Sequence, residues 1–563
     1  MKRLAIILLL VLTGPGAAQT PSLVFDHVTV IDAIGSLPQT DMTVVVTGNR
    51  ITAVGKTGEV TIPQYAQVVE AGGKFLIPGL WDMHTHVQDG FPGAGEEKSL
   101  SPFFKLYLAN GVTGIRDMGG RHLDWFVGIR QEVAEGKRLG PRIVTAGQAL
   151  DGPHATDSIK LPLGDTTLAR QIVREQKQRG ANLVKIYERL PREVYFVVAD
   201  ECRKQGIPFA GHVPVGVSAA EASEVGQSSI EHLGGGRIRE ACYVFETETP
   251  GALPSDPDPS LTAKLQEVLA SFWEGNHDPE LLTPTLNAWL ESGAGKAILK
   301  SVAAEQGKLL SLTFRKETFK DSARVIHGKA VFEKKTRFYK FPVTAAGKID
   351  WIADEAEIYS ETRAAGLFAR FRQNGTWQCP TLTALRAFHR ADPNVMNDPR
   401  LKYVSPWLQM MMHPKNDPRY KNWTALEFDW AKQIYQLDSA LLRKMKDAGV
   451  EFLAGTDSIL DFCFPGFSLH DELALLVEAG LTPMEALQAA TINPARFLNL
   501  ADSLGTVEKG KIADLVLLEA NPLDDIHNTT KIAAVVRDGR LLRQAELQKL
   551  LVEVEDAARK RKF

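Results

Sequence analysis

The sequence contains little cysteine, no excess of charge of either sign, and no long hydrophobic run beyond its first residues. Four Cys among 563 residues cannot form a disulfide scaffold, and any single pairing among them stays open. The 65 basic and 68 acidic residues give a formal charge of −3. Because no basic excess is available to neutralise a phosphate backbone, we expect no nucleic-acid partner. No later segment approaches the ~20 apolar residues of a membrane span.

The chain is rich enough in apolar residues to fold, and too long for one domain. A hydrophobic fraction of 44% is ample for a packed core, which excludes global disorder. At about 100–200 residues per domain, the length predicts two to four domains. We therefore expect a large soluble enzyme that acts on a small-molecule substrate.

The N-terminus has the three parts of a signal peptide. Met1, Lys2 and Arg3 are followed by the apolar run Leu4–Leu12 and the small residues 16–18, which predicts removal of residues 1–18 on export. The alternative, a membrane anchor, is disfavoured because the run is about half the required length. We expect the mature protein in the periplasm or secreted, where a disulfide could form.

Strand-like and helix-like segments alternate over most of the chain. Eight strand-like runs, each followed by a helical pattern, predict an α/β fold with a (β/α)8 TIM barrel. The β-rich chain ends predict a small β-sandwich beside it, and the interruption before the seventh strand predicts an inserted α+β domain. The predicted limits are a signal peptide at 1–18, a composite sandwich at 19–76 and 501–545, a barrel at 77–235 and 357–500, an inserted domain at 236–356, and a helical tail at 546–563.

Two histidines end the first predicted barrel strand. His84 and His86 are two residues apart, so their imidazoles share one face of the strand and point into the barrel at its C-terminal mouth. Two neutral imidazoles on a rigid strand suit a divalent metal, above all Zn²⁺. Such a pair also arises by chance, so the position at the end of a buried run is what favours a metal site.

Lys185 interrupts a run, 183–187, that otherwise fits a fully buried strand. An unpaired buried ammonium costs several kcal/mol, so this lysine needs a partner or a change of chemical form. Neutral lysine can react with CO₂ to give a carbamate that bridges two metals. The alternative is an ion pair with a carboxylate such as Glu188 or Asp117.

Three further candidates end later barrel strands. His212 and His232 close the fifth and sixth strands, and Asp457 closes the eighth. A carboxylate at this position can bind a metal and accept a proton from a metal-bound water. Taken alone, Asp457 could equally be a helix cap, and each histidine a hydrogen-bonded core residue.

Taken together, these residues resemble the amidohydrolase superfamily. The order of HxH, Lys, His, His and Asp on strands one, four, five, six and eight carries the resemblance. So do residues 75–86 (FLIPGLWDMHTH), 479–495 (AGLTPMEALQAATINPA) and 510–516 (GKIADLV). The group that it resembles most contains imidazolonepropionase-like proteins and Xaa-Pro dipeptidases. The resemblance does not extend over residues 236–356, which are the expected source of unusual specificity or of contacts in a homo-oligomer.

The resemblance implies a binuclear centre. His84, His86 and Asp457 would bind one divalent ion, with Zn²⁺ the first choice. His212 and His232 would bind the second, and a carboxylated Lys185 would bridge the two. It also implies that His154, in a stretch that departs from the family's Gly-Gly-His-Gly motif, binds substrate. Tyr187 would polarise the scissile carbonyl, unless it only packs against its neighbours.

The leading hypothesis is hydrolysis of an amide or peptide-like bond in a dipeptide or N-acyl amino acid. A hydroxide bridging the metals would attack the carbonyl, with Asp457 as the general base. The same centre could hydrolyse an ester, lactone, carbamate or phosphotriester. A remote alternative is a non-catalytic binding protein. Arg237 and Arg239 could hold a substrate carboxylate or be ordinary surface charges.

Overall fold

The computed structural model describes residues 22–560 with internal gaps. The residues left out are 88–95, 156–159, 245–254, 275–277, most of 292–305, 321–322, 335, 355–357, 389–392, 414, 417–424 and 460–461. The predicted signal peptide, residues 1–18, lies outside the described residues. No described helix has the length and apolar character that a bilayer crossing requires.

Eight parallel segments form a closed barrel, which confirms the predicted fold. Seven are the strands β6 (Leu80–Thr85), β7 (Val112–Asp117), β8 (Arg142–Thr145), β11 (Val184–Ile186), β12 (Phe209–Gly211), β13 (Ser229–Glu231) and β20 (Trp377–Cys379). The eighth is the segment 452–458. Bridges Ala146–Leu183, Gln378–Phe452 and Thr85–Ser458 join the sheets into a ring. Strands such as β6 and β7 are buried at every position, as expected for a parallel sheet covered by helices.

Helices follow the strands and cover the barrel. They are α1 (Glu96–Ala109), α2 (Leu123–Ala134), α3 (Thr166–Gln178), α4 (Arg192–Gln205), α5 (Ala219–Glu224), α10 (Glu361–Asn374), α13 (Ala425–Asp447) and α14 (Phe467–Glu478). Several begin at side-chain caps. The Asp165 carboxylate accepts the Leu168 N–H of α3, and Ser218 with Glu221 forms a capping box on α5. Such caps satisfy backbone donors that a helix start leaves unpaired.

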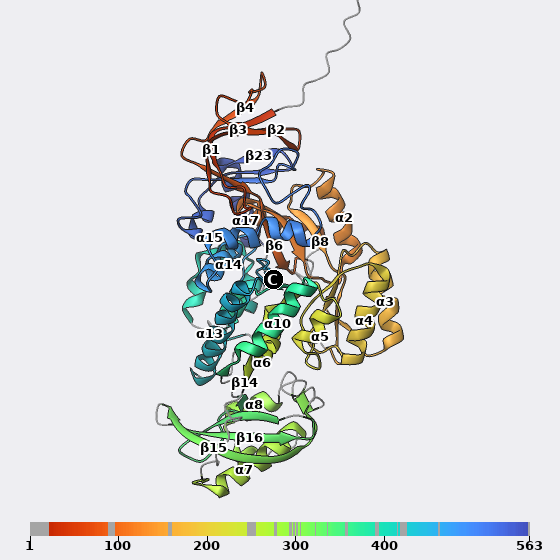
Figure 1. The fold of residues 1–563 in the computed structure, drawn as a ribbon, viewed down its shortest axis with the longest axis vertical. Coiled ribbons are helices and arrows are strands. Elements are labelled where there is room, and N and C mark those ends of the chain that lie inside the picture. Colours follow the sequence, from red (N-terminus) through yellow and green to blue (C-terminus); the bar gives the residue numbers. More distant parts are fainter. Residues whose placement is uncertain are drawn as a thin grey trace, which may run out of the picture.

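Strands from both chain ends form one eight-stranded sheet at the top of Figure 1. They are β1 (Ser22–Val30), β2 (Gln39–Thr47), β3 (Arg50–Lys56), β4 (Gln67–Glu70), β5 (Phe75–Pro78), β21 (Leu515–Leu518), β22 (Ile532–Arg537) and β23 (Arg540–Arg543). Strand β1 pairs with β4 along its first half and with β5 along its second. Apolar side chains of these strands form a core of their own.

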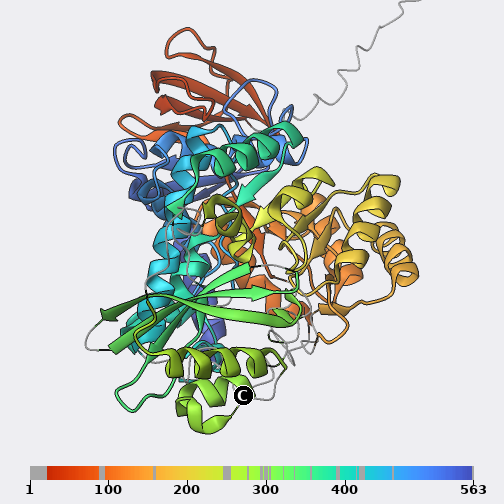
Figure 2. The ribbon, with the colours of Figure 1, turned by 60° about the horizontal axis from the view of Figure 1, so that its bottom comes forward.

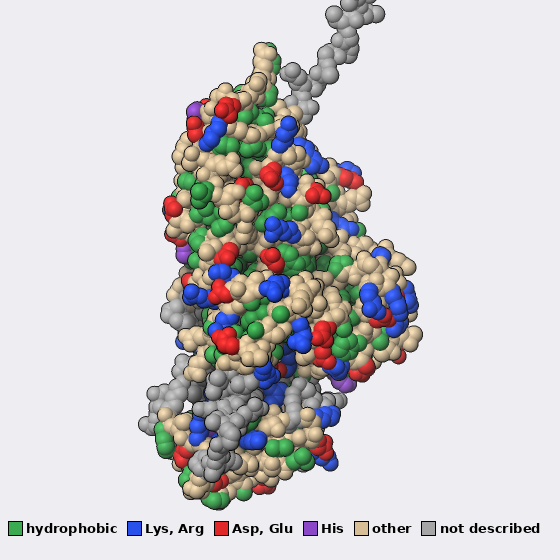
Figure 3. All heavy atoms as spheres, in the orientation of Figure 1, with side chains coloured by type: hydrophobic (Ala, Val, Ile, Leu, Met, Phe, Trp, Pro, Cys, Tyr) green, Lys and Arg blue, Asp and Glu red, His purple; other side chains and the backbone are tan. Residues whose placement is uncertain are grey.

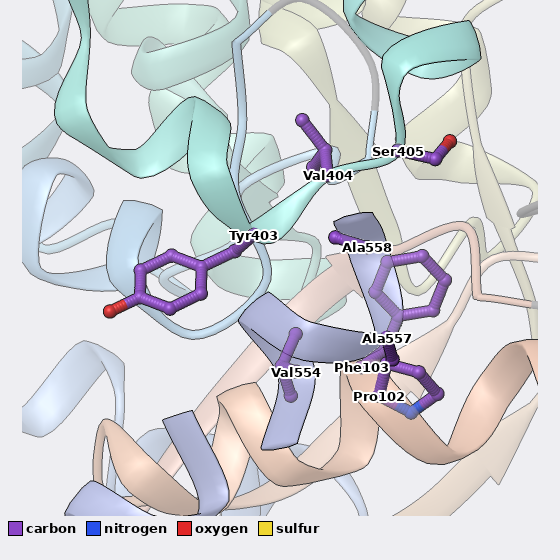
Figure 4. A pocket seen from close by; sticks show the side chains of 8 residues that line it. All are labelled: Pro102, Phe103, Tyr403, Val404, Ser405, Val554, Ala557 and Ala558. Atoms are coloured by element: carbon purple, nitrogen blue, oxygen red, sulfur yellow. The ribbon is translucent and has the colours of Figure 1, made fainter. Parts of the chain in front are cut away.

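The C-terminal helix α17 (Gln544–Lys560) packs against α1, where Lys105 pairs with Glu553 at 2.7 Å. A small cavity lies between these helices and the segment 403–405 (Figure 4). Its volume of ≈10 Å³ holds about one water molecule. This cavity is therefore too small to be a substrate site.

The insertion forms a module at the opposite end of the molecule from the eight-stranded sheet (Figures 1 and 2). A neck of two paired strands, β14 (Tyr243–Val244) and β19 (Ile358–Tyr359), joins it to the barrel. Beyond the neck lies an antiparallel sheet of β15 (Leu309–Lys320), β16 (Ala323–Phe332), β17 (Thr336–Val343) and β18 (Ala353–Asp354). Helices α7 (Pro259–Glu274) and α8 (Pro284–Glu291) pack on this sheet around a core separate from that of the barrel.

The module leaves the barrel after β13, on the side where the parallel strands end. An ion pair joins module and barrel directly, between Arg337 of β17 and Glu240 of α6 (Arg237–Cys242), at 3.5 Å. Acidic and basic side chains are interspersed over most of the face shown in Figure 3, in keeping with the near-zero net charge.

Candidate metal centre

The six predicted metal ligands lie at the C-terminal mouth of the barrel. His84 is in β6 and Lys185 is in β11, while His86, His212 and His232 directly follow β6, β12 and β13. Asp457 is near the end of the eighth segment. Since parallel strands end at one rim, the closed barrel brings together residues from distant parts of the sequence.

A glycine lets the eighth segment lie close to β6. A Cβ at Gly455 would lie 2.6 Å from Cys379 Sγ and 2.7 Å from His84 Cβ, distances that atoms do not adopt without displacement. The close approach allows the backbone N–H of Asp457 to donate to the His84 carbonyl at 2.8 Å. The Asp457 side chain is thereby held beside the two histidines of β6.

Asp457, His84 and His86 form the tightest part of the cluster. Oδ1 of Asp457 lies 3.1 Å from Nε2 of His86 and 3.3 Å from Nε2 of His84. The His84 side chain is fully buried, while those of His86 and Asp457 are 21% and 25% exposed. The cluster is thus accessible from one side.

Lys185 completes the buried side of the cluster. Its Nζ lies 3.2 Å from Nε2 of His84, and the side chain is fully buried. The sequence offered Glu188 and Asp117 as possible ion-pair partners of Lys185, and within the described residues the structure shows neither pair. The Asp117 carboxylate instead accepts hydrogen bonds from the backbone N–H groups of Val87 and Gly119. Burial lowers the pKa of Lys185 to about 8, although Glu231 and Asp457 favour its charged form.

His212 and His232 lie beside this group. Their ring centroids are 4.7 Å apart, and that of His232 is 4.6 Å from His84. Nδ1 of His232 contacts the hydroxyl of Thr381 at 2.6 Å, and that hydroxyl donates to the Pro380 carbonyl. The His232 Nδ1–H therefore donates to Thr381, which leaves the lone pair of Nε2 available to a metal.

Three residues that form or contact the cluster have left-handed backbone conformations although they are not glycine. His232, Thr381 and Asp457 have φ values of 54°, 51° and 61°. Such conformations cost about 1–3 kcal/mol each and cluster at functional sites. At the mouth, the strain falls on residues whose side chains belong to the cluster or contact it.

The local electrostatics favour ligand protonation states suited to a cation. Burial lowers the pKa of His212 well below its usual value and that of His232 to about 3. Burial opposes ionisation of Asp457, yet its contacts with the imidazoles of His84 and His86 hold its pKa well below the usual range. At neutral pH the two imidazoles are neutral and Asp457 is a carboxylate, which are the forms that bind metals.

The residues present fit a divalent metal. Ligand atoms of His84, His232 and Asp457 lie within 4.8 Å of one another. The buried Nδ1 atoms of His86 and His212 have no hydrogen-bond partner among the described residues, although buried polar atoms are normally paired. Imidazole nitrogens and a carboxylate suit Zn²⁺ and similar ions.

Behind His84 lies a pair of residues that the sequence pattern did not single out, Glu231 and Arg116. Glu231 contacts Nδ1 of His84 at 2.7 Å, and Arg116 donates to Glu231 at 3.0 Å, all three side chains being fully buried. Each interrupts a buried strand with a charge, as Lys185 does. A charged residue within an otherwise apolar strand is the signal that singled out Lys185, and the same signal marks Glu231 and Arg116.

The two predicted substrate contacts differ in placement. The Tyr187 ring is partly buried and lies 4.2 Å from that of His212, with Nζ of Lys160 3.6 Å from its centre. His154 is exposed in the loop after β9 (Ala149–Asp151), and among the described residues no hydrogen bond or ion pair joins it to the cluster. Arg237 pairs with Glu240 and Arg239 with Asp438, so both arginines have partners within the protein.

A family model and one group of curated relatives match parts of this chain. The model of the Amidohydrolase family matches residues 75–245 and 429–542, together about half of the chain. The imidazolonepropionase of Geobacillus sp. (strain WCH70) is 37% identical over 112 residues. That match covers 18% of this chain and 25% of the relative, so the chain matches only about a quarter of that protein's length.

Two solved structures share the fold over most of the chain. The crystal structure of a Xaa-Pro dipeptidase with bound methionine in its active site has a TM-score of 0.56 at 17% identity. The match covers 93% of this chain and 100% of that one. A bottromycin amidohydrolase has a TM-score of 0.59 at 19% identity, covering 95% of this chain and 90% of that one. At these identities the likeness shows the fold alone.

Proposed function

Since the chain belongs to the amidohydrolase family, we propose that it is a metal-dependent hydrolase of an amide or peptide-like C–N bond. The proposed substrates are small molecules of dipeptide or N-acyl amino acid type. The observation that carries the proposal is the convergence of His84, His86, His232, Asp457 and Lys185 at the mouth of one barrel. Fold alone would not support it, because the same barrel hosts many activities.

We propose two ligand sets around a shared lysine. His84, His86 and Asp457 would hold one ion and His212 and His232 the second, with Lys185, as a carbamate, the ligand shared by both. The depressed pKa of Lys185 supports this assignment, because only a neutral amine reacts with CO₂. Bound divalent ions would activate a water molecule and polarise the substrate carbonyl.

Asp457 is the proposed general base. Its carboxylate is ionised at neutral pH, partly accessible and fixed beside His84 and His86. It accepts a proton from the attacking water and returns it to the departing amine nitrogen, which leaves neutral. The backbone bond from Asp457 to the His84 carbonyl keeps the carboxylate in place through both transfers.

Tyr187 and His154 are the proposed substrate contacts. Tyr187 directly follows β11, two residues after Lys185, and its ring packs beside that of His212; its hydroxyl is proposed to donate to the carbonyl oxygen. His154 is exposed in the loop after β9 and is proposed to contact the substrate beyond the scissile bond.

We also propose export through the N-terminal segment 1–18, on the strength of its basic, apolar and small-residue order.

A metal analysis and a hydrolysis panel test the proposal together. We expect purified protein to contain up to two equivalents of Zn²⁺ or a similar ion, and to hydrolyse dipeptides or N-acyl amino acids. Esters, lactones, carbamates and phosphotriesters are the comparison substrates. Fast turnover of one of these with none of the amides would overturn the choice of bond, and a metal-loaded protein inert towards every substrate would overturn hydrolase activity itself.

A further inference from the structure

Glu231 is the centre of a buried polar cluster behind the candidate metal centre. Its Oε2 lies 2.7 Å from Nδ1 of His84. Nη2 of Arg116 donates to both carboxylate oxygens, at 3.0 and 3.1 Å, and the Ser229 hydroxyl donates to Oε1. All four side chains are fully buried.

Arg116 is itself fixed by contacts on several sides. Its Nε donates to the Met83 carbonyl on β6, and its Nη1 donates to Ser229 on β13 at 2.9 Å. The guanidinium carbon lies 5.1 Å from the centre of the Phe497 ring. Arg116 therefore links β6, β7 and β13 and leaves the Glu231 carboxylate little freedom to move.

Stability alone is a poor reason for this arrangement. Removing two charges from water costs several kcal/mol per ion, and well-packed apolar side chains of similar volume are often as stabilising as a buried ion pair or more so. The ion pair would therefore contribute something other than stability. The contact between Glu231 and His84 indicates what that is.

The contact determines which nitrogen of His84 faces the cluster. A carboxylate can only accept, so Nδ1 carries the hydrogen and the lone pair lies on Nε2. Nε2 is the atom that faces Asp457 and Lys185. Arg116 balances the negative charge of Glu231, so His84 does not have to be protonated to do so. The Glu231 carboxylate can therefore hold the His84 ring in its neutral form.

Glu231 is not itself placed as a ligand. Its carboxylate lies near Cys379 as well as His84, but His84, Arg116 and Ser229 already donate to it. A metal at this point would have to displace a fully buried guanidinium. The side chain therefore acts through His84.

We propose that Glu231, held by Arg116, is a positioning residue that fixes the tautomer and ring orientation of His84 for metal binding through Nε2. This inference rests on the proposed metal centre. Carboxylates that orient metal-binding histidines typically affect metal affinity by about 10–100-fold. We expect the same range here.

Two variants separate positioning from stability. Glu231→Leu combined with Arg116→Met replaces the ion pair with apolar groups, and Glu231→Gln removes the charge alone. We expect the double variant to keep the thermal midpoint of the metal-free protein, and both variants to bind Zn²⁺ about 10–100-fold more weakly in competition with a chelator. The visible absorption spectrum of Co²⁺-loaded protein should change in both.

A matched control is Glu201→Gln on α4, which alters another buried glutamate paired with arginines, Arg170 and Arg174. It should leave Zn²⁺ affinity unchanged. If the double variant does not fold, the Zn²⁺ affinity and Co²⁺ spectrum of Glu231→Gln alone test the positioning role. Unchanged Zn²⁺ affinity and Co²⁺ spectrum in a folded Glu231 variant would overturn the inference alone. Absence of Zn²⁺ binding by the unaltered protein would overturn the metal centre and this inference with it.

Discussion

Nζ of Lys185 lies 3.2 Å from Nε2 of His84, and both side chains are fully buried. Two cations at this distance without solvent would repel each other strongly. Burial lowers the pKa of both groups, that of Lys185 to about 8, so above about pH 8 the contact joins a neutral amine to a neutral imidazole. This is the state from which a lysine carbamate can form.

Replacement of Lys185 should abolish the shared ligand. In Lys185→Met, which keeps the volume but cannot form a carbamate, we expect metal content to fall and turnover to drop by about 100-fold or more, because an activated water is lost. ¹³C NMR after exposure to labelled bicarbonate should show a carbamate signal in the unaltered protein and none in the variant. A variant with full metal content and turnover would contradict the bridging role.

The carbamate should also form with a defined pH dependence. Only the neutral amine reacts, and the pKa of Lys185 is lowered from its ordinary 10.5 to about 8. At constant dissolved CO₂, reconstitution of metal-free protein with Zn²⁺ should therefore accelerate by about tenfold per pH unit up to about 8 and then level off. A rate that continued to rise to the ordinary lysine pKa would show that burial does not act on this amine.

Asp457→Asn should separate metal binding from catalysis. The amide keeps an oxygen that can bind a metal but cannot accept the proton of the attacking water. We expect turnover to fall by about 10²–10⁴-fold with metal content largely retained, measured by steady-state kinetics and metal analysis. Asp471→Asn, which affects an ion pair with Arg400 outside the centre, is the matched control. Retained activity in metal-loaded Asp457→Asn would exclude the general-base role.

Gly455→Ala should disturb the centre through the backbone. The added Cβ would meet His84 and Cys379 at 2.6–2.8 Å, so the eighth segment must move away from β6. Overpacking of this kind costs about 1–3 kcal/mol, and a displacement near 1 Å at the reacting groups can lower turnover by about 100-fold. Thermal unfolding and kinetics would measure both. Gly128→Ala in α2, where a Cβ meets nothing within 4 Å, should leave both unchanged or slightly raise stability.

The barrel and the ligand set could be predicted from sequence because they depend on local patterns. Strand and helix alternate in the chain, and His84, His212 and Asp457 all follow apolar runs, so one rim collects them once the barrel closes. The prediction of the barrel, which the structure confirms, required no long-range contact other than the closure of the strands into a ring. The role of each ligand stays a prediction.

Contacts between distant strands could not be predicted in the same way. The pairing of Glu231 with Arg116 depends on which side chains meet across the barrel interior, and the need for glycine at 455 depends on how closely two non-consecutive segments approach. The Thr381 hydroxyl beside His232 is a third case, because its left-handed backbone is fixed by the surrounding fold. The alternation of side chains along one strand shows which face each side chain occupies, but not how close it lies to residues of another strand.

The inserted module offers a test of where substrate choice resides. Its two neck strands pair Val244 with Ile358, so a two-residue Asn-Gly turn between these residues can replace 245–357 as a tight hairpin. Among the described residues, the apolar cores of the module and the barrel have no member in common. This deletion also removes the partly exposed ion pair between Arg337 and Glu240, which contributes little to stability.

The shortened protein should therefore fold and keep its metal content. Because the module leaves the barrel on the side of the mouth, we expect its removal to change relative kcat/KM values across the hydrolysis panel by at least about tenfold, equivalent to about 1.4 kcal/mol. The largest effect should fall on the bulkiest substrates, which reach furthest from the centre. Unchanged ratios in a metal-loaded, folded protein would place specificity in the barrel loops, and loss of metal would show that the module supports the centre directly.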